Sequence, residues 1–260
     1  MSAVQLSLLG ATAFLALAAS AGQLRFLRTE FLTTRRRVAA AGLLVAILAA
    51  VVFYPLTGGH LAAAAEAEEM WFPALFLGHG LLIVFLILWS ALRSPAVSPA
   101  FLEALHHLGS DVRMGVVVGI RGWALTIAVT LTAALIASQF GVTPTEPDDI
   151  PPLMLWLAAL PLGHKLLVIA AAMTVEEAFF RGFLQARFGL VVSSLLFTLA
   201  HANYGLPFML ISVLTISLLI GRAYERTHRL VPCIVAHGIF DAVQLLIVVP
   251  WAVHMLHSAT

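Results

Sequence analysis

The chain has 260 residues, of which 61% are hydrophobic and 10% are charged, and its mean hydropathy is +1.01. A soluble domain carries about 25% charged residues, so this composition excludes an ordinary soluble protein and indicates an integral membrane protein. The formal net charge is +1, and no basic run is dense enough to make nucleic acid an expected partner. A single cysteine, Cys233, excludes an internal disulfide framework.

Long apolar runs predict an all-α membrane protein with about eight transmembrane helices, because a helix needs about 20 apolar residues to cross the bilayer. The predicted spans lie near residues 3–22, 38–57, 71–92, 114–139, 164–187, 189–204, 206–222 and 231–254. Residues 151–163 are read as an extra half-helix or a bent start of the fifth span, since Pro161 and Gly163 favour a break. We divide the chain into residues 1–150, with about four spans and their loops, and a helical core at 151–260.

The distribution of arginine predicts the orientation in the membrane. Arginines occur after the first, third, fifth and seventh spans, whereas the connections GGHLAAAAEAEE and GVTPTEPDDIPP are acidic and contain no Lys or Arg. Cytoplasmic loops are enriched in Lys and Arg, so we expect the arginine side to face the cytoplasm and both termini to lie outside. The expected location is a bacterial inner membrane, with the lipid bilayer as a partner.

Six ionisable side chains fall deep inside the predicted spans, where such groups are costly and are functional by default. They are Glu176, Glu177 and Arg181 in the fifth span, His201 in the sixth, and His237 and Asp241 in the eighth. Counted from the arginine side at the helical rise, Glu176 lies roughly 15 Å deep, Asp241 roughly 16 Å and His201 roughly 20 Å. Three helices at similar depth predict one polar cavity within the membrane.

The spacing of these residues assigns different partners to the two glutamates. Adjacent helical residues point about 100° apart, so Glu176 and Glu177 cannot face the same way. Glu177 and Arg181 are four residues apart in the favourable order, and we predict that they form a pair. Glu176 then has no local cation, which suits a residue that takes up a proton and returns it. His237 and Asp241 are also four residues apart and share one face.

This set of residues predicts hydrolysis by an activated water. Glu176 and His201 would deprotonate the water, and His237, oriented by Asp241, would donate to the oxyanion that forms. No cofactor is expected; the alternative is a zinc ion held by His201, His237 and Glu176, although the chain has no H-E-x-x-H motif. A proton-coupled transporter built from the same residues is a further alternative, against which no inverted repeat is visible.

Three stretches resemble motifs of the CPBP family, the CAAX-protease and bacteriocin-processing membrane proteases, also called the ABI or type II CAAX prenyl endopeptidase group. EEAFFR (176–181) matches E-E-x-x-x-R, and FTLAH (197–201) resembles F-x-x-x-H. HGIFD (237–241) resembles H-x-x-x-N, with Asp in the place of Asn. Order and spacing agree over residues 164–245, whereas the first four spans agree only in hydropathy.

The resemblance implies a glutamate-type intramembrane endopeptidase with a cavity open to the membrane and the cytoplasm. By position, Glu176 resembles the water-activating glutamate and His201 its partner, Glu177 and Arg181 resemble the companion pair, and His237 and Asp241 resemble the oxyanion side. An ionised Asp241 cannot donate a hydrogen bond, so it must be protonated or act by orienting His237.

Family members are linked to peptide maturation, bacteriocin self-immunity and removal of C-terminal sorting tails. The expected partner is therefore a membrane-associated protein or peptide, lipidated or with a C-terminal tail; a non-proteolytic scaffold or immunity protein is the alternative.

Overall fold

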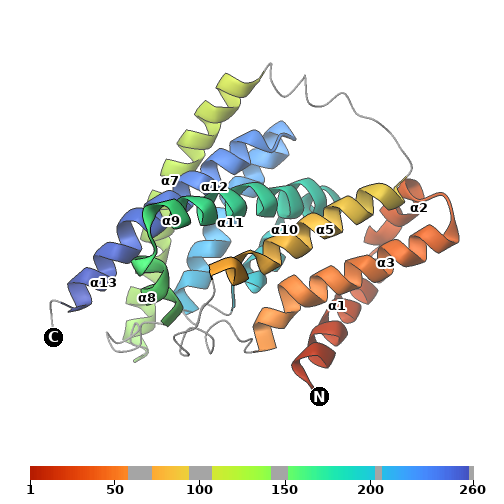
Figure 1. The fold of residues 1–260 in the computed structure, drawn as a ribbon, viewed down its shortest axis with the longest axis horizontal. Coiled ribbons are helices and arrows are strands. Elements are labelled where there is room, and N and C mark those ends of the chain that lie inside the picture. The colour runs from red at the N-terminus through yellow and green to blue at the C-terminus, as the bar shows by residue number, and fades with distance from the viewer. Residues whose placement is uncertain (58–71, 94–106, 142–151, 203–206, 258–260) are drawn as a thin grey trace.

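The computed structural model of the chain describes residues 1–57, 72–93, 107–141, 152–202 and 207–257, which form helices and short connections (Figure 1). Seven helical stretches in these ranges are long and apolar enough to cross a membrane. The chain is therefore an all-α, multi-pass integral membrane protein, as the composition predicts. One of the seven stretches, Leu162–Ala200, contains the fifth and most of the sixth of the eight predicted spans. The two acidic connections lie almost wholly outside the described residues.

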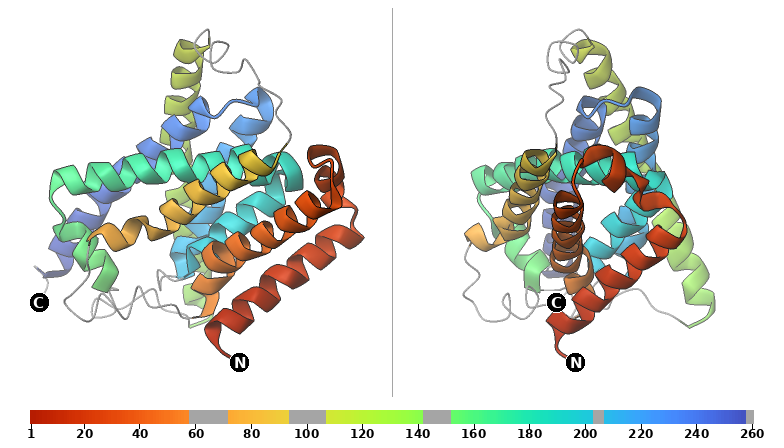
Figure 2. Two further views of the ribbon diagram at one scale, coloured as in Figure 1. Left: turned by 45° about the vertical axis from the view of Figure 1, so that its right-hand side comes forward. Right: turned by 90° about the vertical axis from the view of Figure 1, so that its right-hand side faces the viewer.

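The N-terminal helices form one side of the molecule, where α1, α3 and α5 run next to one another (Figures 1 and 2). The elements are α1 (Ala3–Ser20), η1 (Gln23–Arg25), α2 (Phe26–Glu30), α3 (Thr34–Leu48), η2 (Ala49–Phe53), η3 (Tyr54–Thr57), η4 (Phe72–Phe76) and α5 (Leu77–Leu92). Aromatic rings join α5 to the segment that carries the two glutamates. The ring centroid of Phe85 lies 5.4 Å from that of Phe179 and 4.8 Å from that of Phe183.

The C-terminal part of the chain forms the other side. Its elements are α7 (Leu108–Gln139), α8 (Pro152–Ala159), α9 (Leu162–Ala171), η6 (Ala172–Glu176), η7 (Ala178–Gln185), α10 (Ala186–Ala200), α11 (Pro207–Thr227), α12 (Val231–Val243), η9 (Gln244–Val248) and α13 (Val249–His257). The long helix α7 packs along both α11 and α12. Glycines permit this close approach: a Cβ on Gly115 would lie 2.8 Å from the carbonyl oxygen of Pro232, and one on Gly119 would lie 3.0 Å from that of Ala236.

The carboxylate of Glu30, whose side chain is 13% exposed, connects three helices at the arginine-rich end. Arg187 Nη2 lies 2.8 Å from Glu30 Oε1, and Trp89 Nε1 donates to Glu30 Oε2 at 3.1 Å. Arg93, at the end of α5, lies 3.7 Å from the same carboxylate. Because Glu30 belongs to α2 and Arg187 to α10, these contacts fix the N-terminal helices against the helix that carries the candidate site.

The two breaks that the sequence predicts around the fifth span are confirmed. Helix α8 ends at Ala159 and α9 begins at Leu162, so the chain turns at Pro161. At the other end, Gly189 interrupts α10 with φ 81° and ψ 173°, at the boundary between the fifth and sixth predicted spans. This conformation is readily accessible only to glycine, so the reversal of direction between the two spans depends on this residue.

Replacement of Gly189 by alanine is expected to destabilise the fold through backbone strain alone, because a Cβ there would have open space around it. Strain of this kind costs about 1–3 kcal/mol, so the apparent Tm of purified protein in detergent should fall by several degrees. Gly163→Ala is the matched control, since Gly163 also has open space but lies within α9 without a positive φ. Equal melting temperatures for the two variants would contradict the strain at Gly189.

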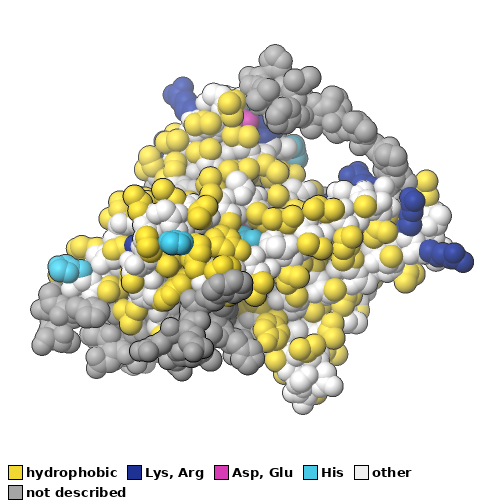
Figure 3. Space-filling model, viewed as in Figure 1, with side chains coloured by type: hydrophobic (Ala, Val, Ile, Leu, Met, Phe, Trp, Pro, Cys, Tyr) yellow, Lys and Arg dark blue, Asp and Glu magenta, His cyan; other side chains and the backbone are white. Residues whose placement is uncertain are grey.

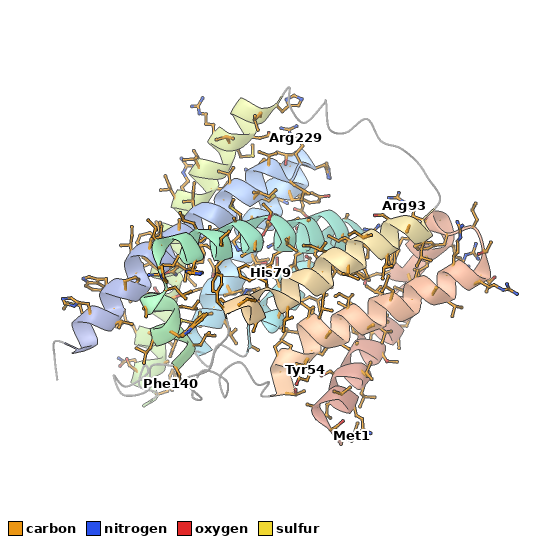
Figure 4. The ribbon with its side chains drawn as sticks, in the orientation of Figure 1. Met1, Tyr54, His79, Arg93, Phe140 and Arg229 are labelled. Atoms are coloured by element: carbon orange, nitrogen blue, oxygen red, sulfur yellow. The ribbon has the colours of Figure 1, made fainter. Side chains whose placement is uncertain are left out.

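The arginine-bearing ends of the helices lie opposite the ends near the chain termini, which is the arrangement that the predicted orientation requires. Met1, Tyr54 and Phe140 lie along the lower edge of Figure 4, whereas Arg93 and Arg229 lie towards the upper edge. In Figure 3, hydrophobic side chains cover the middle of the visible face, and most Lys and Arg side chains gather along its upper and right edges. The arginine-bearing ends therefore point away from both termini, with an apolar belt between them.

Candidate active site

The helix that carries the two adjacent glutamates widens into π-helical turns on either side of Glu177. The turns are η6, which ends at Glu176, and η7, which begins at Ala178. Such turns are rare and frequently occur at functional sites. They leave the two glutamates with different neighbours: Glu176 faces α5 and the end of α10, whereas Glu177 faces η7 and α12. The sequence predicts this divergence from the angle between adjacent helical residues.

Glu177 and Arg181 form the predicted ion pair, and both side chains are completely buried. Arg181 Nε donates to Glu177 Oε2 at 3.0 Å, and both side chains are 0% exposed. Arg181 Nη2 also donates to Ser217 Oγ on α11 at 3.0 Å, and the guanidinium lies 5.3 Å from the ring centroid of Phe197 on α10. The pair therefore connects η7 with two further helices.

The second oxygen of Glu177 holds His237, a contact that the sequence spacing does not predict. His237 Nδ1 lies 2.8 Å from Glu177 Oε1, and His237 Nε2 lies 3.3 Å from Asp241 Oδ2. The predicted His237–Asp241 contact is thus present, and Glu177 is the closer of the two carboxylates. Both nitrogens of a histidine donate only when the ring carries two protons, which is the form that two flanking carboxylates favour. Glu177 therefore links Arg181 on one side with His237 on the other.

Glu176 lies between two histidines from different helices. His201 Nε2, at the end of α10, is 3.9 Å from Glu176 Oε2, and His79 Nε2, on α5, is 3.2 Å from Glu176 Oε1. Glu176 Oε2 and His79 Nε2 are both buried and have no hydrogen-bond partner among the described residues. The side chains of all three residues are 15–17% exposed, so the group borders open space while most of it is enclosed.

Both histidines beside Glu176 are oriented by backbone carbonyls of their own helices. His201 Nδ1 lies 2.8 Å from the carbonyl oxygen of Phe197, and His79 Nδ1 lies 3.3 Å from that of Leu75. A carbonyl only accepts hydrogen bonds, so these contacts assign the proton of each neutral ring to Nδ1. In that tautomer His201 Nε2 is an acceptor, and its 3.9 Å separation from Glu176 Oε2 suits a bridging donor such as water. His79 Nε2, at 3.2 Å from Glu176 Oε1, donates to that oxygen when its ring carries a second proton.

The structure places the six predicted residues in two neighbouring clusters. Glu176 and His201 form one part, and Glu177, Arg181, His237 and Asp241 form the other. Phe197 separates the parts: its ring centroid lies 4.5 Å from that of His201 and 5.9 Å from that of His237. His79 is the member that the six-residue prediction leaves out, although an ionisable side chain within an apolar span is the signal that identified the others. In Figure 4 it lies near the middle of the view, between the two edges described above.

Cys233 takes no part in the group, although it precedes His237 by one turn. It is completely buried, and its sulfur lies 3.7 Å from the carbonyl oxygens of both Ile220 and Arg229. A thiol directed at backbone carbonyls inside the α11–α12 contact is not accessible to a substrate.

A zinc site built from His201, His237 and Glu176 does not fit the arrangement. A catalytic zinc takes three protein ligands, yet both nitrogens of His237 lie against carboxylate oxygens of Glu177 and Asp241. Within the part of the chain that the structure describes, no three His, Cys, Asp or Glu side chains group as a metal-binding set.

Comparisons with known proteins single out the part of the chain that holds the three motifs. Residues 156–243 match the family model of the type II CAAX prenyl endopeptidase Rce1-like proteins. The uncharacterized protein YpbD of Bacillus subtilis (strain 168) is 45% identical over 83 residues, which are 32% of this chain and 44% of that protein. The similarity thus spans less than half the length of that relative, and no solved structure matches the chain. Residues 156–243 are therefore similar to the Rce1-like type II CAAX prenyl endopeptidases, the group whose motifs EEAFFR, FTLAH and HGIFD resemble.

Proposed function

We propose that the chain is an intramembrane glutamate endopeptidase that hydrolyses a peptide bond with a water held between Glu176 and His201. The observation that carries this proposal is the 3.9 Å between Glu176 Oε2 and His201 Nε2. That distance is too long for a direct hydrogen bond and short enough for one water to contact both atoms. A buried carboxylate oxygen without a partner among the described residues is the acceptor that such a water needs.

The first chemical step follows from these positions. The water donates one proton towards Glu176 Oε2 and the other towards His201 Nε2, which leaves an oxygen lone pair for attack on the scissile carbonyl carbon. Glu176 takes up the first proton as the carbon–oxygen bond forms, and the carbonyl electrons move onto its oxygen. Glu176 then returns this proton to the leaving nitrogen as the peptide bond breaks.

His237 and Asp241 form the side of the site that stabilises the oxyanion. Glu177 holds His237 through Nδ1, so Nε2–H is the donor directed into the site. Asp241 accepts from this nitrogen at 3.3 Å in the absence of substrate. The oxyanion of the tetrahedral intermediate takes the place of the Asp241 oxygen at Nε2. In this proposal Glu177 orients His237 through Nδ1, and Asp241 holds Nε2 until the oxyanion forms, which would be the role of an aspartate where the family motif has asparagine.

The substrate is a membrane-associated protein or peptide, because the site lies among apolar helices that face lipid. The description of the family model names prenyl CAAX endopeptidases, so a lipidated C-terminal segment is one candidate and a C-terminal sorting tail is another. The enzyme would act in a bacterial inner membrane, with its arginine-bearing ends in the cytoplasm. It requires no cofactor in this mechanism.

The test compares protein termini in the membrane and secreted fractions of cells that carry the wild-type chain or Glu176→Gln at matched expression. We expect uncut precursors to accumulate in the variant, which would establish proteolysis and identify the substrate together. Purified protein incubated with a prenylated CAAX peptide tests the first substrate class separately. Identical sets of termini, with the wild-type phenotype retained, would favour a scaffold, an immunity protein or a proton-coupled transporter instead.

A further inference from the structure

We infer that His79, on α5, is a positioning residue for Glu176 and that the N-terminal half of the chain thereby completes the active site. This inference rests on the proposed function of Glu176. His79 Nε2 lies 3.2 Å from Glu176 Oε1, closer than His201 Nε2 lies to Oε2. Its ring is mostly enclosed, with 16% of the side chain exposed.

Each of the two histidines faces a different carboxylate oxygen of Glu176. His79 faces Oε1, whereas His201 faces Oε2, the oxygen that binds the water. A proton on His79 Nε2 converts its contact into a charge-assisted donation that fixes the carboxylate plane. Oε2 is then directed at the water and at His201 by a contact that takes no part in the proton transfer. The assignment explains why a carboxylate that acts as a base needs a second histidine beside it.

The position of His79 is set by neighbouring residues of η4 and by the packing of α5 against the helix that carries Glu176. Its Nδ1 lies 3.3 Å from the carbonyl oxygen of Leu75, and the Phe76 ring centroid lies 6.1 Å from the imidazole. Further along α5, the rings of Phe85 and Trp89 both lie 4.8 Å from that of Phe183, on the same helix as Glu176. These ring contacts hold α5 against the helix that carries Glu176, so the imidazole is placed by packing.

The family match begins at residue 156, so it does not extend to α5. Residues 164–245 carry every motif of the resemblance, and the first four spans agree with it only in hydropathy. A residue that contacts Glu176 from α5 therefore gives the N-terminal helices a role in the reaction itself. The same geometry makes the spacing between α5 and η6 a determinant of activity.

The experiment measures cleavage, by pulse-chase, of the precursors that accumulate in Glu176→Gln cells. His79→Phe removes the donor, and we expect it to slow cleavage about 100-fold, the loss typical of a misplaced catalytic group. His79→Gln supplies an amide N–H near the position of Nε2, and we expect it to retain cleavage within about 10-fold of wild type. Gly80→Ala is the matched control on the same helix, because a Cβ there meets open space, and its cleavage should equal that of wild type.

Two further readouts separate positioning from a structural role. The His79→Phe protein should be recovered in wild-type amounts, and uncut precursor should co-purify with it as it does with Glu176→Gln. Loss of folded protein or of precursor binding in His79→Phe, or wild-type cleavage by it, would overturn the inference while Glu176 keeps its role. If Glu176→Gln cells accumulate no precursor, the proposed function is wrong. The role of His79 rests on that function and is then wrong as well.

Discussion

Replacement of Glu176 by glutamine is expected to abolish cleavage while leaving the protein folded in the membrane. Glutamine keeps the shape of the side chain but cannot take up the proton of the water, and loss of a general base costs about 10²- to 10⁴-fold in rate. The fold should survive because Glu176 Oε2 has no hydrogen-bond partner among the described residues, and the side chain forms no pair with Arg181. Precursor cleavage and the apparent Tm of the purified protein measure the two effects independently.

Glu225→Gln is the control for this result, because it removes a carboxylate of the same type from an exposed position. Glu225 lies 2.7 Å from Arg222 with 37% of its side chain exposed, and exposed pairs of this kind contribute little to stability. Cleavage and melting temperature should both equal those of wild type. Undiminished cleavage by Glu176→Gln would instead show that another group activates the water.

Most of the candidate site could be predicted from the sequence because membrane spans make polar residues conspicuous. Few ionisable residues are placed deep in apolar helices, and the helical rise converts their positions into depth. That reasoning brings His201 and Asp241 to the level of Glu176 without any tertiary information, and the structure groups them. Pro161 likewise indicates its break locally, because the missing N–H is a property of a single residue.

The contacts that sequence reasoning misses are those that depend on how helices pack. Whether Glu177 reaches His237 depends on the relative rotation of η7 and α12, which the spacing within either helix does not determine. The proximity of His79 to Glu176 requires α5 to lie against η6, although the two residues are nearly a hundred positions apart. The close approach of α7 to α12 at Gly115 and Gly119 depends in the same way on which face of each helix is turned inward.

Replacement of Glu177 by glutamine is expected to reduce both stability and cleavage. Arg181 is 0% exposed and cannot lose its proton, so removal of its carboxylate leaves an uncompensated buried charge that costs about 3–5 kcal/mol. The donation to Ser217 and the contact with Phe197 remain, but neither supplies a negative charge. The apparent Tm and the amount of protein recovered from the membrane should therefore fall. An unchanged Tm would show that the pair does not stabilise the fold.

The double variant Glu177→Gln/Arg181→Met separates the structural contribution of Glu177 from its contribution to the site. Removing both charges leaves no unpaired ion, and an apolar replacement of a buried pair is often neutral. The double variant should therefore melt at a higher temperature than the Glu177→Gln single variant. Cleavage should not recover with stability, because Glu177 Oε1 also holds His237 at 2.8 Å and glutamine cannot stabilise a doubly protonated ring in the same way. Recovery of both properties together would make the pair purely structural. Recovery of stability alone would show that one glutamate balances the charge of Arg181 and orients His237.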